Sequence, residues 1–208
     1  MNSSRFASRS MSRAVFGALL LVPALCFAHV GADAGAHHGA AAALAAGFVH
    51  PFTGLDHLAA MLVLGVWSAL TAKRIWLAPL VFAATLAIGA VTGLAGVALP
   101  SVEPMIAASL LALGLLLATG AKLPAIGGAA VAALFALFHG AAHGQELAGH
   151  DALFAIGGMV VATALLHAAG IGLGLALKNR NVWLPRVAGA AVALFGVSLL
   201  APLLAGLA

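Results

Sequence analysis

The sequence predicts an all-α polytopic membrane protein, in which about six transmembrane helices follow a cleavable signal peptide and a short broken or re-entrant segment. Of the 208 residues, 64% are hydrophobic and 7% are charged, whereas soluble domains carry about 25% charged residues. Apolar stretches close to the length of about 20 residues that crosses a bilayer recur along the chain. The 25 glycines fit close helix packing in lipid. We therefore expect residues 29–208 to form a single transmembrane helical domain.

The first 28 residues have the pattern of a secretory signal peptide. Arginines precede the apolar residues 14–27, and Ala28 ends a pattern typical of a cleavage site. Cleavage there would make His29 the mature N-terminus and would remove Cys26, the only cysteine. The mature chain would then have no thiolate with which to bind a metal. The alternative is that this stretch stays attached as a first span.

Six longer apolar stretches follow, and each is predicted to cross the membrane. They are residues 54–72, 75–99, 104–120, 123–143, 151–177 and 183–207. The apolar residues 39–49 before them are too few to cross comfortably. We expect this segment to be a half-helix or a re-entrant segment.

The basic residues predict the orientation of the chain. Beyond the N-terminal arginines, they follow every second predicted span: Lys73, Arg74, Lys122, Lys178, Arg180 and Arg186. Because basic loops stay in the cytoplasm, we expect a bacterial inner-membrane protein whose mature N-terminus faces the periplasm. The sequence pI is about 10.3, but these residues do not form one patch, so we expect the partner to be the lipid bilayer and not nucleic acid.

The stretch FHGAAHGQE, residues 138–146, ends an apolar span with three polar side chains. His139 and His143 are four residues apart and share a helix face, and Glu146 lies three residues further on nearly the same face. Two imidazoles at this spacing can bind one divalent ion, and the carboxylate can bind it too or orient a ring. The alternative is that these side chains lie at a wet interface and end the helix. We favour a metal site, because ionisable groups in membrane spans are costly and usually functional.

A second polar stretch, HPFTGLDH, runs from His50 to His57. On one continuous helix these histidines would be about 10 Å apart, too far to share a small ion. Pro51 disfavours helical angles at His50, and Thr53 with Asp56 resembles a capping box that starts a new helix near residue 54. We expect the break to turn His50 towards Asp56 and His57. The alternative is that Asp56 only caps the helix.

Two further histidines are candidates on weaker grounds. At a mature N-terminus, the α-amine and ring of His29 would together chelate a metal. The alternative is that this segment is a disordered polar tail. His167 is a lone histidine inside the fifth long span. We consider it a relay between outer histidines and the cytoplasm, with a hydrogen-bonded packing role as the alternative. All the other histidines lie on the predicted outer side, which suggests uptake.

The two polar stretches resemble the motifs of the HupE/UreJ family of nickel/cobalt permeases. The family pattern H-P-x-x-G-x-D-H matches at residues 50–57, and F-H-G-x-A-H-G-x-E matches at residues 138–146. The resemblance implies secondary uptake of Ni²⁺, or alternatively Co²⁺, to supply nickel enzymes such as hydrogenase or urease. The metal would be the transported substrate, with no tightly bound cofactor and no enzymatic step. The positions that carry over as metal contacts are Asp56, His57, His139, His143 and Glu146.

Two other functions would use the same residues. An intramembrane zinc-dependent hydrolase would hold a water-activating ion with three ligands. A metal-binding accessory protein would bind the ion without transporting it. Imidazole and carboxylate ligands suit Ni²⁺, Co²⁺ and Zn²⁺ alike, so the sequence leaves the choice of ion open.

Overall fold

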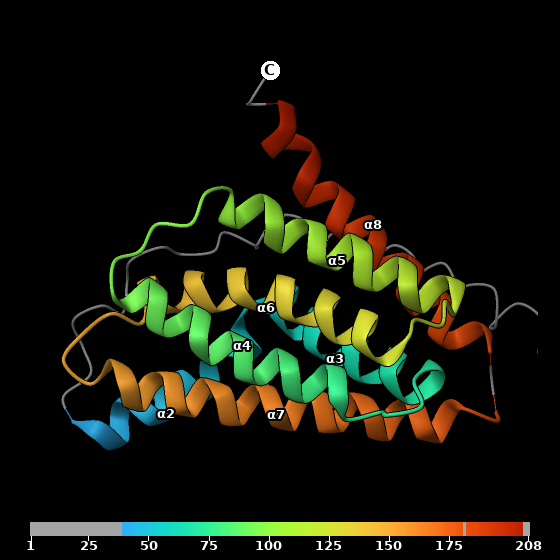
Figure 1. Ribbon diagram of the computed structural model, residues 1–208, viewed down its shortest axis with the longest axis horizontal. Helices are drawn as coiled ribbons and strands as arrows, with labels where there is room; N and C mark the ends of the chain where they lie inside the picture. Colours follow the sequence, from blue (N-terminus) through green and yellow to red (C-terminus); the bar gives the residue numbers. More distant parts are fainter. Residues whose placement is uncertain (1–38, 181, 206–208) are drawn as a thin grey trace, which may run out of the picture. The chain divides into compact units, whose positions relative to one another are not determined.

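A computed structural model describes residues 39–180 and 182–205 (Figure 1). These residues form seven α-helices and no β-strand. The helices are α2 (Ala40–Thr53), α3 (Leu55–Thr71), α4 (Leu77–Leu94), α5 (Val102–Thr119), α6 (Ala125–Glu146), α7 (Ala152–Leu177) and α8 (Trp183–Ala205). The predicted signal peptide, residues 1–28, and the candidate ligand His29 lie outside the described residues.

Helices α4 to α8 are each long and apolar enough to cross a membrane, so this is a membrane protein. Their most apolar 18-residue windows have mean hydropathies of 1.8 to 2.2. Helix α3 has 17 residues and passes the same test only together with α2, which meets it at an angle of 80°. The predicted all-α membrane fold is confirmed, with five candidate spans among the described residues, or six if α2 and α3 together form one bent span.

The break differs in detail from the prediction. Helix α2 does not stop near residue 49 but runs through His50 and Pro51 to Thr53, and the chain leaves helical geometry at Gly54. Pro51 lacks the N–H of one helix bond, and the helix ends two residues later at Thr53. The predicted capping box is wrong. The Thr53 hydroxyl donates backwards to the His50 carbonyl (2.7 Å), and Asp56 Oδ1 accepts from the backbone N–H of its neighbour (2.9 Å).

The main helix pairs are α4 with α6, α5 with α8, and α7 with both α2 and α3. The α4–α6 and α3–α7 pairs run parallel, whereas α5–α8 and α2–α7 run antiparallel. Helices α4 and α6 approach each other closely because glycines of each helix lie against the backbone of the other. A Cβ at Gly140 would overlap the Leu86 carbonyl, and one at Gly89 would overlap the carbonyl of Leu137. These contacts occur beside His139 and bring its helix against α4.

Large side chains fill the middle of the bundle. The largest fully buried ones include Phe82, Met61, Leu64, Leu110 and Met159. Helix α8 contributes least, because only 17% of its most apolar window is buried, compared with 39–44% for the other four long helices. The core that supports the polar residues is therefore built from α3 to α7, and α8 lies against α5 at its edge (Figure 1).

The two ends of this bundle carry different charges. The α4–α5 and α6–α7 connections lie at the same end as α2 (left in Figure 1), and the α3–α4, α5–α6 and α7–α8 connections lie at the other. Lys73, Arg74, Lys122, Lys178 and Arg180 occupy the connections of that second end, with Arg186 in the first turn of α8. We call it the basic end, and the other the α2 end.

We expect Gly140→Ala to destabilise the protein by about 1–3 kcal/mol, because overpacking a tight contact costs about that much. Gly157→Ala is the matched control, because a Cβ there meets nothing within 4 Å. In a helix, that control change should be neutral or slightly stabilising. Thermal unfolding in detergent, followed by circular dichroism, measures both. Equal melting temperatures for the two variants would contradict the close α4–α6 contact.

Candidate metal site

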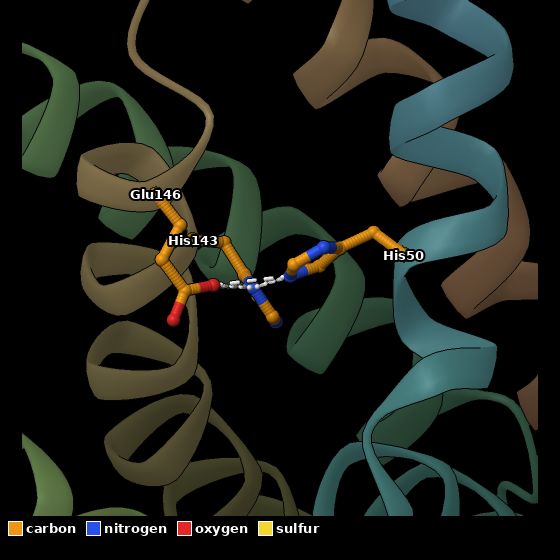
Figure 2. Close-up of side chains that lie close together, drawn as sticks. All are labelled: His50, His143 and Glu146. Carbon is orange, nitrogen blue, oxygen red and sulfur yellow. Dashed lines mark hydrogen bonds and ion pairs between the residues drawn. The ribbon is translucent and has the colours of Figure 1, made fainter. Parts of the chain in front are cut away.

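Three side chains from two helices meet at the α2 end. His50 Nε2 lies 2.9 Å from His143 Nδ1 and 3.0 Å from Glu146 Oε2, and His143 Nδ1 lies 3.3 Å from the same carboxylate oxygen. Figure 2 shows His50 reaching across from α2 towards the pair on α6. These ligand atoms all lie within 4.8 Å of one another. We call His50, His143 and Glu146 the outer triad.

The outer triad is partly exposed to solvent. The side chains of His50 and Glu146 are 28% and 34% exposed, whereas that of His143 is 1% exposed. His143 and Glu146 are presented together by the last turn of α6, as their spacing predicts. His50 reaches them because α2 bends away from α3 at Gly54. An ion from solvent would therefore meet His50 and Glu146 first and the buried imidazole last.

A second group of imidazoles lies beneath the outer triad. The His57 ring is 4.2 Å from the His143 ring and 4.8 Å from the His139 ring, measured between centroids. His139 is fully buried. We call His57, His139 and His143 the inner histidines. His143 belongs to both groups, so it joins an exposed set of ligands to a buried one.

Neighbouring oxygens determine which ring nitrogens of the inner histidines are free. Ser109 Oγ lies 2.6 Å from the Ile106 carbonyl and 2.9 Å from His139 Nε2. A hydroxyl has one hydrogen and a carbonyl only accepts, so Ser109 donates to Ile106 and accepts from His139 Nε2–H. In a neutral ring this leaves the lone pair on His139 Nδ1. That nitrogen is buried and has no partner.

The same reasoning applies to His57. Its Nδ1 lies 2.8 Å from Asp56 Oδ1, and a carboxylate can only accept, so Nδ1–H donates and Nε2 holds the lone pair. His57 Nε2 and His143 Nε2 are also buried without a partner. A carboxylate or hydroxyl that holds the far nitrogen of a histidine is the usual support for a metal ligand. All three inner histidines thus offer a free nitrogen.

The chemistry of this donor set suits a borderline divalent ion. Imidazole and carboxylate bind Ni²⁺, Co²⁺ and Zn²⁺. Within the described part of the chain, neither Asp56 nor Glu146 forms an ion pair with Lys or Arg. Both negative charges therefore remain available to offset a dication.

Sequence comparison relates this chain to known proteins. The family described as "HupE / UreJ protein" matches residues 17–199. Protein HupE from Rhizobium leguminosarum bv. viciae is 42% identical over 186 residues, which is 88% of this chain and 94% of the relative.

The chain belongs to the HupE/UreJ family. No solved structure matches it.

The two family motifs meet in space, although the detail differs from the sequence prediction. His50 turns towards His143 and Glu146, not towards Asp56 and His57, because α2 stays helical through residue 53. His139 does not join Glu146, since its ring faces the buried serine. Metal binding by these residues remains a prediction.

His167 lies apart from both groups, deeper in α7, with no hydrogen bond to either ring nitrogen. The hydrogen-bonded packing role considered for it is therefore wrong. Ser109 was missed by sequence reasoning. A serine inside an apolar span usually bonds its own helix backbone, and nothing in the sequence shows that it also meets a histidine 30 residues away.

We expect Ser109→Ala to raise the Kd for Ni²⁺ by about tenfold to a hundredfold, the usual effect of losing such a supporting bond. Ser109→Thr keeps the hydroxyl and should restore binding. Ser198→Ala is the control, because that hydroxyl donates to a carbonyl of α8 at an exposed position. Isothermal titration of the purified protein gives the Kd values. An unchanged Kd in Ser109→Ala would mean that the serine does not support the ligand.

Proposed function

We propose that this protein is a secondary permease that takes up Ni²⁺, or alternatively Co²⁺, across the bacterial inner membrane to supply enzymes such as hydrogenase or urease. The main support is the position of His143, whose ring contacts both the outer triad and His57. Nδ1 lies in the half-exposed outer triad, Nε2 is buried without a partner, and the ring centroid lies 4.2 Å from that of His57. One side chain can therefore pass an ion from an open set of ligands to a closed one.

The first step of such uptake is loss of water from the ion. The idealised cost of moving even a univalent ion into a medium like the protein interior is on the order of 20 kcal/mol. The outer triad supplies two nitrogens and one oxygen while solvent still reaches His50 and Glu146. Water can thus be replaced ligand by ligand, so the ion is never bare.

The second step is transfer inwards. The free nitrogens of His57 and His139 are held ready by Asp56 and Ser109, so they need no change of tautomer. Ligands must be unprotonated to bind metal, so an ion at the outer triad uses the lone pairs of His50 Nε2 and His143 Nδ1. Because a neutral imidazole has one lone pair, transfer of the ion to His143 Nε2 requires the proton of that ring to move from Nε2 to Nδ1. No covalent step occurs, and the metal is substrate throughout.

The orientation follows from charge. If the basic end faces the cytoplasm, as basic loops generally do, the α2 end and its outer triad face the periplasm. The ion then enters at the site of highest ligand density. Its positive charge also moves down the membrane potential, which favours uptake of each elementary charge by about 2.3 kcal/mol per 100 mV.

We expect purified protein in proteoliposomes to accumulate ⁶³Ni²⁺, and unlabelled Co²⁺ to compete. The reason is that both ions suit the same nitrogen and oxygen ligands. Imposed pH gradients and membrane potentials, applied separately, identify the driving force. Tight binding without uptake would instead identify a metal-binding accessory protein, and zinc-dependent cleavage of added lipid or peptide would identify a hydrolase.

We expect His143→Ala to reduce nickel uptake to the level of protein-free vesicles, because the residue serves both ligand groups. His150→Ala is the matched control. It removes an exposed histidine from the same end of the bundle, and uptake should stay normal. Thermal unfolding of both variants checks that the fold is intact. Normal uptake in a folded His143→Ala protein would refute the transfer role.

A further inference from the structure

Two polar side chains on α7 are buried without any partner. His167 and Thr163 are one helical turn apart, with exposed fractions of 1% and 0%. Both ring nitrogens of His167 and the hydroxyl of Thr163 lack a hydrogen bond. An unsatisfied buried polar group costs about 1–3 kcal/mol, and native proteins rarely keep one without a reason. Here three such atoms share one face of one helix.

Thr163 contrasts with other threonines of the bundle. The hydroxyls of Thr71, Thr92 and Thr119 donate to a carbonyl three or four residues earlier in their own helices, at 2.7 Å. This bond is the ordinary way for a threonine to satisfy its hydroxyl in a helix. Thr163 has not taken it, so its oxygen remains available to another ligand. Packing alone would be served as well by valine.

The aromatic ring of Phe82 lies between this pair and the inner histidines. Its centroid is 5.8 Å from that of His139 and 5.1 Å from that of His167. Phe82 comes from α4, which packs beside α7 (Figure 1). The rings of His143, His57, His139, Phe82 and His167 thus form an unbroken series from the half-exposed outer triad into the bundle.

His167 lies near the middle of the 26-residue α7. At about 1.5 Å per residue, it is about 22 Å from the first residue of this helix and about 15 Å from the last. An ion that left the inner histidines for the basic end would therefore reach it about halfway through the bundle.

We propose that His167 and Thr163 form a second, deeper binding station for the divalent transition-metal ion, separated from the inner histidines by the ring of Phe82. The inference rests on the proposed transport function and names the next ligands on its path. One imidazole nitrogen and one neutral hydroxyl make a weak site without a carboxylate. Weak coordination suits a station that must release its ion.

Cysteine substitution tests whether an ion reaches this depth. In a Cys26→Ser background, His167→Cys and Thr163→Cys each place one thiol at the station. Leu165→Cys is the matched control, because this side chain of the same helix is 53% exposed on the bundle surface. Co²⁺ bound to a thiolate gives a charge-transfer absorption band in the near ultraviolet that imidazole and carboxylate ligands do not give.

We expect Co²⁺ added to the detergent-purified proteins to produce this band in His167→Cys and Thr163→Cys and not in Leu165→Cys. The visible d–d absorption of Co²⁺ at the undisturbed histidines checks that each protein is folded and loaded. Both station variants could show the d–d absorption of the parent protein and still lack the charge-transfer band. That result would refute the station. Thr163→Cys keeps the test valid if His167→Cys does not fold.

Uptake provides an independent readout. We expect His167→Leu to bind Ni²⁺ with the Kd of the parent protein, because the outer triad and inner histidines are unchanged, yet to lose uptake to the level of protein-free vesicles. Normal uptake in a folded His167→Leu protein would overturn the proposal. Failure of the proposed transport function can be distinguished from failure of the station proposal. In the first case the unmodified protein itself would show no uptake in the same vesicles.

Discussion

A polar side chain among membrane-spanning helices has no bulk water to bond to, so it must find its partners within the protein. In each inner histidine this constraint is met on one ring nitrogen and left unmet on the other. Asp56 and Ser109 satisfy His57 Nδ1 and His139 Nε2, while the opposite nitrogens stay buried and unpartnered. The same bonds that make these residues tolerable in the bundle also set the tautomers that a metal would need.

The backbone is shaped to make this arrangement possible. The 80° bend at Gly54 lets α2 deliver His50 to α6 while α3 carries His57 towards the centre of the bundle. Backbone contact at Gly89 and Gly140 allows α6 to lie directly against α4. The bend at Gly54 and the glycines at the α4–α6 contact are therefore as important to the site as the ligands themselves.

Charge is arranged along the bundle in a way that favours a cation at one end. The negative charges of Asp56 and Glu146 lie among the histidines, whereas Lys and Arg side chains of the described residues lie at the basic end. Deeper in the bundle, His167 and Thr163 carry no charge to hold an ion. A dication would thus be attracted strongly at entry and held weakly further in, which is the order that passage requires.

The sequence alone determined the class of fold, because 64% hydrophobic composition and repeated apolar stretches leave few alternatives to a helical membrane protein. It also identified six of the residues that meet at the α2 end, since their motif spacing is local and helical periodicity is regular. It placed the break within a few residues of Gly54 but misjudged the direction in which His50 turns.

Only the tertiary structure decided which side chains meet. His50 pairs with residues 93 and 96 positions away, and Ser109 with a histidine 30 positions away, and no local pattern encodes such contacts. Thr163 and His167 likewise look like ordinary packing residues until the surrounding helices show that nothing bonds to them. Helical periodicity says which face a side chain occupies, but the facing helix, set by close packing of the whole bundle, decides what that face meets.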